Sequence, residues 1–146
     1  MTRLTCSSVF ASRYPLFGSW LFCEVVAGFR FSKGEQSIYH LVKDRYTRAG
    51  FEYLRIENKL QNGTPDILLY NSEAYLFIEA KYYKGRKLHS IADDLKYQPG
   101  QLAMLLQSVT KGYRHALLVG HTSGELAILS GRKTDAENIA NVVGRL

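Results

Sequence analysis

The chain has 146 residues, of which 46% are hydrophobic, enough to bury the core of one domain and too few residues for two. Its 19 Lys and Arg residues against 13 Asp and Glu give a formal net charge of +6, which favours an anionic partner such as nucleic acid. Cys6 and Cys23 have neither a CxxC nor a Cys/His ligand spacing, so the sequence indicates neither a disulfide framework nor a structural zinc site. An intracellular protein is therefore expected.

Residues 1–30 are aromatic and Ser-rich, without the periodicity of the rest of the chain. The apolar stretch at residues 16–29 is interrupted by Glu24 and is too short and mixed to span a bilayer, so no membrane segment is expected. Residues 1–30 are treated as an N-terminal extension whose role stays open. They could form an extra strand or helix packed on the domain, or reflect the choice of translation start site. Residues 31–146 form the predicted domain.

The first predicted helix covers residues 34–48, where apolar side chains recur at helical spacing and Gly50 follows as a stop: Ile38, Val42, Tyr46 and Ala49. Ser32-Lys33-Gly34-Glu35 matches a capping box, in which the glutamate side chain would accept a hydrogen bond from the backbone amide of the N-cap residue. The same spacing places Glu35 on the stripe that faces the sheet, where a carboxylate needs a metal ion or a hydrogen-bond partner. Both roles can hold together.

A strand is predicted at residues 51–60, followed by a β-hairpin whose β-prone runs at 67–70 and 75–78 flank a polar four-residue turn. If the runs pair symmetrically about this turn, Asp66 lies directly across from Glu79, with Cβ atoms about 5 Å apart. Lys81 then projects from the same face, and a register shift by one residue would break the arrangement.

The second half of the chain is expected to add a helix, two strands and a final helix. The helix follows Pro99, carries apolar residues at 102, 105, 106 and 109, and ends at Gly112. Strands are predicted at residues 114–120 and 125–129, and the last helix at 135–143. The predicted fold is α/β, with an αβββαβ core and a central mixed sheet flanked by helices.

Asp66 and Glu79 place two like charges face to face, which is destabilising unless a cation lies beside them. Oxygen ligands suit a divalent ion such as Mg²⁺, and the backbone carbonyl of Ala80 could join the two carboxylates. Lys81 would orient or deprotonate an attacking water or neutralise charge on a phosphate, as metal-assisted phosphodiester hydrolysis requires. The alternative is a solvent-exposed hairpin end with an ordinary Glu–Lys neighbour pair.

Gly63-Thr64-Pro65-Asp66 and Ile78-Glu79-Ala80-Lys81 resemble motifs II and III of the PD-(D/E)XK nuclease superfamily, whose core also has the αβββαβ order. Pro99-Gly100-Gln101 and Gly112 resemble the VRR-NUC branch. The chain is similar to archaeal-type Holliday-junction resolvases as well, where a glutamate early in the first helix completes the acidic set; Glu35 fits that position. The resemblance implies restriction-endonuclease-like architecture and Mg²⁺ as cofactor, with Mn²⁺ as a substitute.

The resemblance also implies that Gln101 contacts the substrate phosphate or the metal's water shell, although a buried amide capping its helix would look the same. Gln98 competes for this role. Basic side chains after the predicted active strand suit contacts to the DNA backbone, or are ordinary surface charge: Lys84, Arg86 and Lys87. Arg55 and Lys59 could line the same cleft, but the sequence does not fix their direction.

The function expected from these features is a metal-dependent, structure-selective DNA endonuclease that acts on branched DNA in recombination or repair. By analogy with small resolvases it would work as a homodimer, and the apolar N-terminal segment could supply the interface. Two alternatives stay open: a catalytically silent nucleic-acid-binding module, and a nuclease subunit of a phage or mobile-element replication complex.

Overall fold

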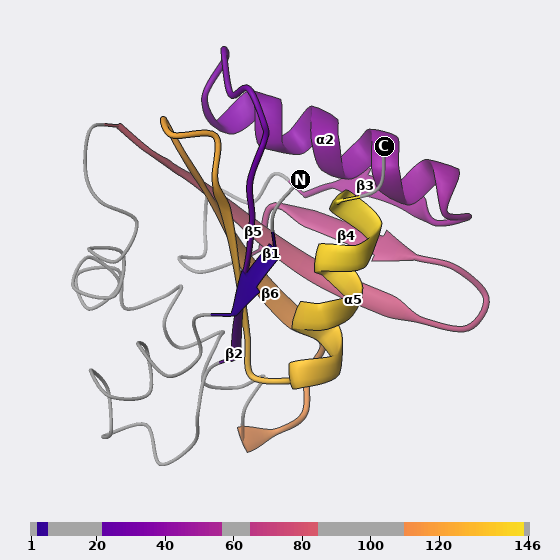
Figure 1. Cartoon of the computed structure of the whole chain (residues 1–146). Helices are drawn as coiled ribbons and strands as arrows, with labels where there is room; N and C mark the ends of the chain where they lie inside the picture. Colours follow the sequence, from indigo (N-terminus) through magenta and orange to yellow (C-terminus); the bar gives the residue numbers. More distant parts are fainter. Residues whose placement is uncertain (1–2, 6–21, 57–64, 85–109, 145–146) are drawn as a thin grey trace.

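The computed structural model describes residues 3–5, 22–56, 65–84 and 110–144. Within them the chain forms one seven-stranded sheet and two helices of eleven or more residues (Figure 1). The elements in chain order are β1 (Arg3–Thr5), β2 (Phe22–Val26), α2 (Glu35–Arg48), β3 (Glu52–Arg55), β4 (Ile67–Tyr70), β5 (Tyr75–Tyr83), β6 (His115–His121), β7 (Leu126–Ser130) and α5 (Lys133–Val143).

The strand order in the sheet is β1-β2-β7-β6-β5-β4-β3. Strands β5 and β6 run parallel and every other neighbouring pair is antiparallel, so the sheet is mixed. One helix followed by three antiparallel strands and then a parallel strand confirms the predicted α/β class and its sheet. The predicted helix at residues 102–109 lies outside the described residues.

The hairpin register is the predicted one. Tyr70 pairs with Tyr75, and Ile67 pairs with Ile78, so the residue before β4 stands across from Glu79. The side chains of one hairpin face are all buried in the main core: Ile67, Leu69, Leu76, Ile78 and Ala80. This alternation fixes the register, because a slip by one residue would expose the entire buried set.

Helix α2 packs on that buried face through the side chains predicted from its spacing, Ile38, Val42 and Tyr46, whereas Ala49 is exposed. Helix α5 contributes Ala136, Ile139, Ala140 and Val143 to the same core. Both helices therefore cover the same face, as Figure 1 shows, and they contact each other there. Strands β6 and β7 are nonetheless buried on both faces, since consecutive residues along them are inaccessible to solvent.

The capping box predicted at the start of α2 is wrong. The N-cap is Gly34, with φ 60° and ψ −128°, and no side chain caps the helix. Glu35 is thus the first helical residue rather than the third, and its carboxylate is left for other contacts. The positive φ favours glycine, and a Cβ at this position would lie 3.2 Å from a ring carbon of Tyr82.

Part of the N-terminal extension lies in the sheet. Strand β2 pairs with both β1 and β7, and Cys23, Val25 and Val26 are buried. Cys23 is disulfide-bonded, although the sequence indicates no disulfide framework. No helix in the described part of the chain is long and apolar enough to cross a membrane.

Candidate active site

Asp66 is held by both strands beside it. Its backbone carbonyl accepts the Ile56 amide at 2.8 Å, just past β3, and its Oδ2 accepts the Ala80 amide of β5 at 3.0 Å. Because Ala80 follows Glu79 directly, the Asp66 carboxylate lies over the stretch of β5 that carries the second predicted acid. The hairpin register and this backbone contact agree on the same juxtaposition.

Glu79 is only 6% exposed although it carries a carboxyl group. Its pKa is raised to about 8, chiefly by burial and then by the Asp66 charge, the hydrogen bond to Asp66 and the Glu35 charge, against the opposing effect of Lys81. In the absence of a cation the Glu79 carboxyl therefore keeps a proton near neutral pH. Ionising Asp66 and Glu79 together is therefore unfavourable, and a bound cation would relieve this repulsion.

Glu35 reaches this region through Tyr39, one helical turn further along α2. The Tyr39 hydroxyl lies 2.7 Å from Glu35 Oε1 and 3.1 Å from Asp66 Oδ2, so its single proton is shared between two carboxylate acceptors. Burial and then the hydrogen bond to Glu35 raise the Tyr39 pKa well above its usual value, so the phenol stays protonated. Tyr39 is not among the site residues predicted from the sequence, although its i+4 spacing from Glu35 is a usable signal.

Arg55 closes the site on the side of β3. Its guanidinium lies 3.7 Å from the centre of the Tyr39 ring, and its Nη1 donates to the Asp66 carbonyl at 3.2 Å. The same nitrogen lies 3.7 Å from Asp66 Oδ1, as a loose ion pair. The direction that the sequence left open for Arg55 is therefore toward the carboxylates.

The oxygen atoms gathered here fit a hard divalent cation. Two carboxylates from neighbouring strands, Asp66 and Glu79, and the carbonyl of Ala80 are the groups that could hold it. Within the described ranges, no three His, Cys, Asp or Glu side chains are grouped so as to hold a metal ion. Glu35 is accordingly connected to the pair through Tyr39.

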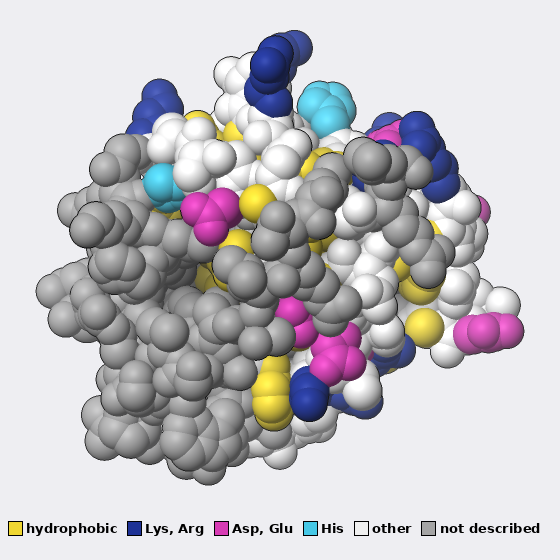
Figure 2. Space-filling view, in the orientation of Figure 1, with side chains coloured by type: hydrophobic (Ala, Val, Ile, Leu, Met, Phe, Trp, Pro, Cys, Tyr) yellow, Lys and Arg dark blue, Asp and Glu magenta, His cyan; other side chains and the backbone are white. Residues whose placement is uncertain are grey.

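Of the remaining predicted site residues, some lie in the described part of the chain and others lie outside it. Lys81 is half-buried on β5 and acts on the Glu79 charge, and Lys84 is exposed just beyond the end of that strand. Three predicted site residues, Arg86, Lys87 and Gln101, lie outside the described residues, as do Gln98 and Lys59. On the face shown in Figure 2, the described Lys and Arg side chains stand at several separate places rather than in one stripe.

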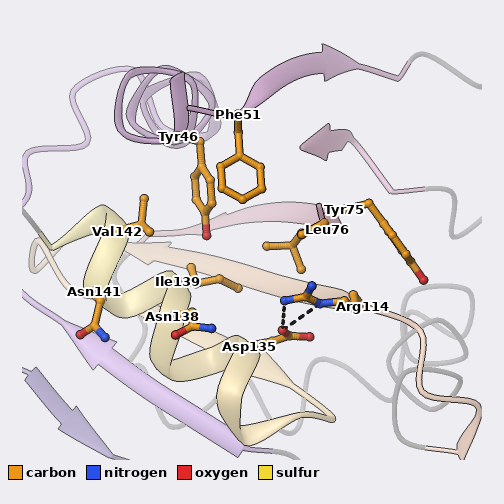
Figure 3. Close-up of a pocket in the computed structure, with 11 residues that line it drawn as sticks. Tyr46, Phe51, Tyr75, Leu76, Arg114, Asp135, Asn138, Ile139, Asn141 and Val142 are labelled. Atoms are coloured by element: carbon orange, nitrogen blue, oxygen red, sulfur yellow. Dashed lines mark hydrogen bonds and ion pairs between the residues drawn. The ribbon is translucent and has the colours of Figure 1, made fainter. Parts of the chain in front are cut away.

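A pocket of about 280 Å³ opens near Tyr75, at the opposite end of β5 from Lys81 (Figure 3). Its wall includes Tyr46 from α2, and its polar edge is an ion pair in which Arg114 Nε and Nη2 donate to Asp135 Oδ1 at 3.1 and 2.8 Å. Asp135 is buried on α5 and Arg114 precedes β6, so this pair joins the helix to the sheet. The opposite charges of Arg114 and Asp135 balance each other, whereas Asp66 and Glu79 are both acidic.

The chain matches no described protein family and no curated protein. Among solved structures it is similar to Hjc, a Holliday junction resolvase from the archaeal hyperthermophile Archaeoglobus fulgidus. The identity is 19% and the TM-score 0.36, over 79% of this chain and 98% of that chain. The description of the fold and of the site is based on the strand pairing and the contacts given above, and not on this similarity.

Proposed function

We propose that this protein is a metal-dependent endonuclease that hydrolyses phosphodiester bonds in DNA. The observation that carries the proposal is the opposition of Asp66 and Glu79 across β4 and β5, with Lys81 two residues further along the same strand. Glu79 is buried and Asp66 is partly buried, so ionising both carboxyl groups together is costly, and a structural role alone gives no reason for placing them face to face. Binding of a divalent cation supplies one.

In the proposed mechanism, Asp66, Glu79 and the Ala80 carbonyl would hold Mg²⁺, with Mn²⁺ as a substitute. The bound ion would lower the pKa of a coordinated water and polarise the scissile phosphate. Lys81, half-buried beside Glu79, would orient that water and stabilise negative charge as it develops on the phosphate oxygens. Ionised Glu79 is needed to bind the ion, so metal binding would displace its proton.

DNA is the proposed substrate because the chain has a net charge of +6 and because its motifs resemble those of PD-(D/E)XK nucleases. The resemblance to resolvases favours branched DNA, a homodimer that cuts two strands, and a place in recombination or repair. Lys84, Arg86 and Lys87 would contact the backbone, and Gln101 would contact the phosphate or the metal's water shell.

A binding module without catalysis is the second candidate, favoured by the net charge of +6, which attracts nucleic acid whether or not the site is catalytic. The Lys81→Ala variant separates the two. We expect it to lose cleavage of a labelled four-way junction by at least about 100-fold while its affinity for the junction changes little, because the backbone contacts remain. Gel-shift and single-turnover cleavage assays on the same substrate measure both. Wild-type-like cleavage by Lys81→Ala would contradict the assigned site.

A further inference from the structure

One contact at the carboxylate site is not required by the nuclease chemistry itself. The Tyr39 hydroxyl has a single proton, yet it faces two carboxylates, Glu35 Oε1 at 2.7 Å and Asp66 Oδ2 at 3.1 Å. Glu35 comes from the first turn of α2 and Asp66 from the chain just before β4. The phenol thus joins acidic groups from two elements that repel each other without a donor between them.

The Tyr39 ring is itself fixed in place. The Arg55 guanidinium lies over it, 3.7 Å from the ring centre, and is anchored by the hydrogen bond from Nη1 to the Asp66 carbonyl. A cation stacked on an aromatic face restricts the ring to one orientation and strengthens the contact where water is partly excluded. The side chain of Tyr39 therefore holds its hydroxyl between the two carboxylates, without any rotation of the ring.

We propose that Tyr39 is a positioning residue that holds Glu35 beside Asp66, so that both carboxylates serve the same divalent cation, Asp66 directly and Glu35 through the phenol. The inference rests on the proposed function, since the cation belongs to it. It also assigns Glu35 a different part from the direct ligand that the resemblance implied. Removing the hydroxyl leaves two neighbouring carboxylates without a shared donor, and Glu35, which is partly exposed, turns toward solvent.

Mn²⁺ binding to the DNA-free protein, measured by isothermal titration calorimetry, tests this without relying on activity. Tyr39→Phe should weaken Mn²⁺ binding about 10- to 100-fold, the usual effect of losing a group that orients a metal ligand. The matched control is Tyr53→Phe on β3, a half-buried tyrosine close enough to Asp66 to sense its charge. No hydrogen bond of its hydroxyl to a described residue is present, so its Mn²⁺ affinity should stay within about 2-fold of the wild type.

A double-mutant cycle separates positioning from a general structural effect. Glu35→Gln should weaken Mn²⁺ binding by about the same factor as Tyr39→Phe, and combining the two should add less than about 3-fold, because both act through one bridge. Effects that multiply would overturn the inference. If Tyr39→Phe melts early, Glu35→Gln decides, since an unchanged affinity in that variant also overturns it.

The outcome for the wild type distinguishes the two levels of the proposal. If the wild-type protein binds Mn²⁺ and Tyr39→Phe binds it equally well, the positioning role is wrong and the proposed nuclease stands. If the wild-type protein binds no Mn²⁺ at millimolar concentration, the metal-dependent function falls and the positioning role falls with it.

Discussion

Glu79 is the site residue whose ionisation is most strongly opposed by its surroundings. Its carboxyl group is buried beside Asp66, so the site stores unfavourable electrostatic free energy until a proton or a cation enters. Lys81 offsets part of this cost but does not cancel it, because the net effect on the Glu79 pKa is a rise. A group whose charge is suppressed in the folded state links stability to pH.

In EDTA, the free energy of unfolding should fall as pH rises from 6.5 to 8, by up to about 1 kcal/mol per pH unit. The folded carboxyl keeps its proton to about pH 8 whereas the unfolded one releases it near 4.5, so the folded state binds more protons in this window. Stability from this source is full below pH 4.5 and is lost on approaching pH 8. Urea titrations across the window measure it, and Glu79→Gln should remove most of the slope. An identical slope in both proteins would contradict the burial of Glu79.

At this scale the sequence predicted the residues whose position follows from strand register, and missed those that depend on packing. Asp66 and Glu79 could be paired because a four-residue turn sets which residues oppose each other. The i+4 spacing could have linked Tyr39 to Glu35, but the contacts of Tyr39 and Arg55 at Asp66 depend on how α2 lies across the sheet and which way β3 faces.

Among the elements, α5 is tied to the sheet by a buried charge pair. Asp135 is 2% exposed, and its Oδ1 accepts two hydrogen bonds from Arg114 just before β6 (Figure 3). Another pair on the same helix, Lys133 and Glu137, is separated by 3.8 Å at the surface. The two pairs share a helix and differ in burial, which makes them a matched comparison.

Asp135→Asn should lower the free energy of unfolding by about 2 kcal/mol, because Arg114 then donates to a neutral amide oxygen instead of a buried carboxylate and loses its counter-charge. Glu137→Gln should cost less than about 0.5 kcal/mol, since solvent screens the exposed pair. Chemical denaturation of both variants gives the two values. Equal losses would show that burial does not set the strength of the Arg114 pair.

Periodic elements were predicted well and element ends poorly. The spacing of Ile38, Val42 and Tyr46 gave α2, and the predicted final helix at 135–143 lies within α5. The start of α2 was misread because a Ser-x-x-Glu pattern suggests a cap, whereas Gly34 turns the chain with a positive φ one residue before Glu35. The Ser-x-x-Glu pattern carries no information on the backbone angle of Gly34, where a Cβ would lie 3.2 Å from a ring carbon of Tyr82.

In the molecule as a whole, the site lies on β5, which carries both Glu79 and Lys81. Strand β5 lies between an antiparallel neighbour that brings Asp66 and a parallel neighbour, β6, that is fully buried along its first six residues. A central strand gives Glu79 and Lys81 a rigid base, as a catalytic arrangement needs. The pairing of β2 with β7 was not predictable, because residues 1–30 lack a period that would assign them to a sheet.

We propose that the Asp66 and Glu79 site cleaves DNA with a divalent cation. Cleavage of labelled four-way junction, flap, single-stranded and plain duplex DNA, with Mg²⁺ or with EDTA, by the wild type and by Asp66→Ala, tests this directly. We expect Mg²⁺-dependent cutting, strongest on a branched substrate, that EDTA and Asp66→Ala both abolish. Cutting that persists in Asp66→Ala, or binding of all four DNAs without any cleavage in Mg²⁺, would contradict it.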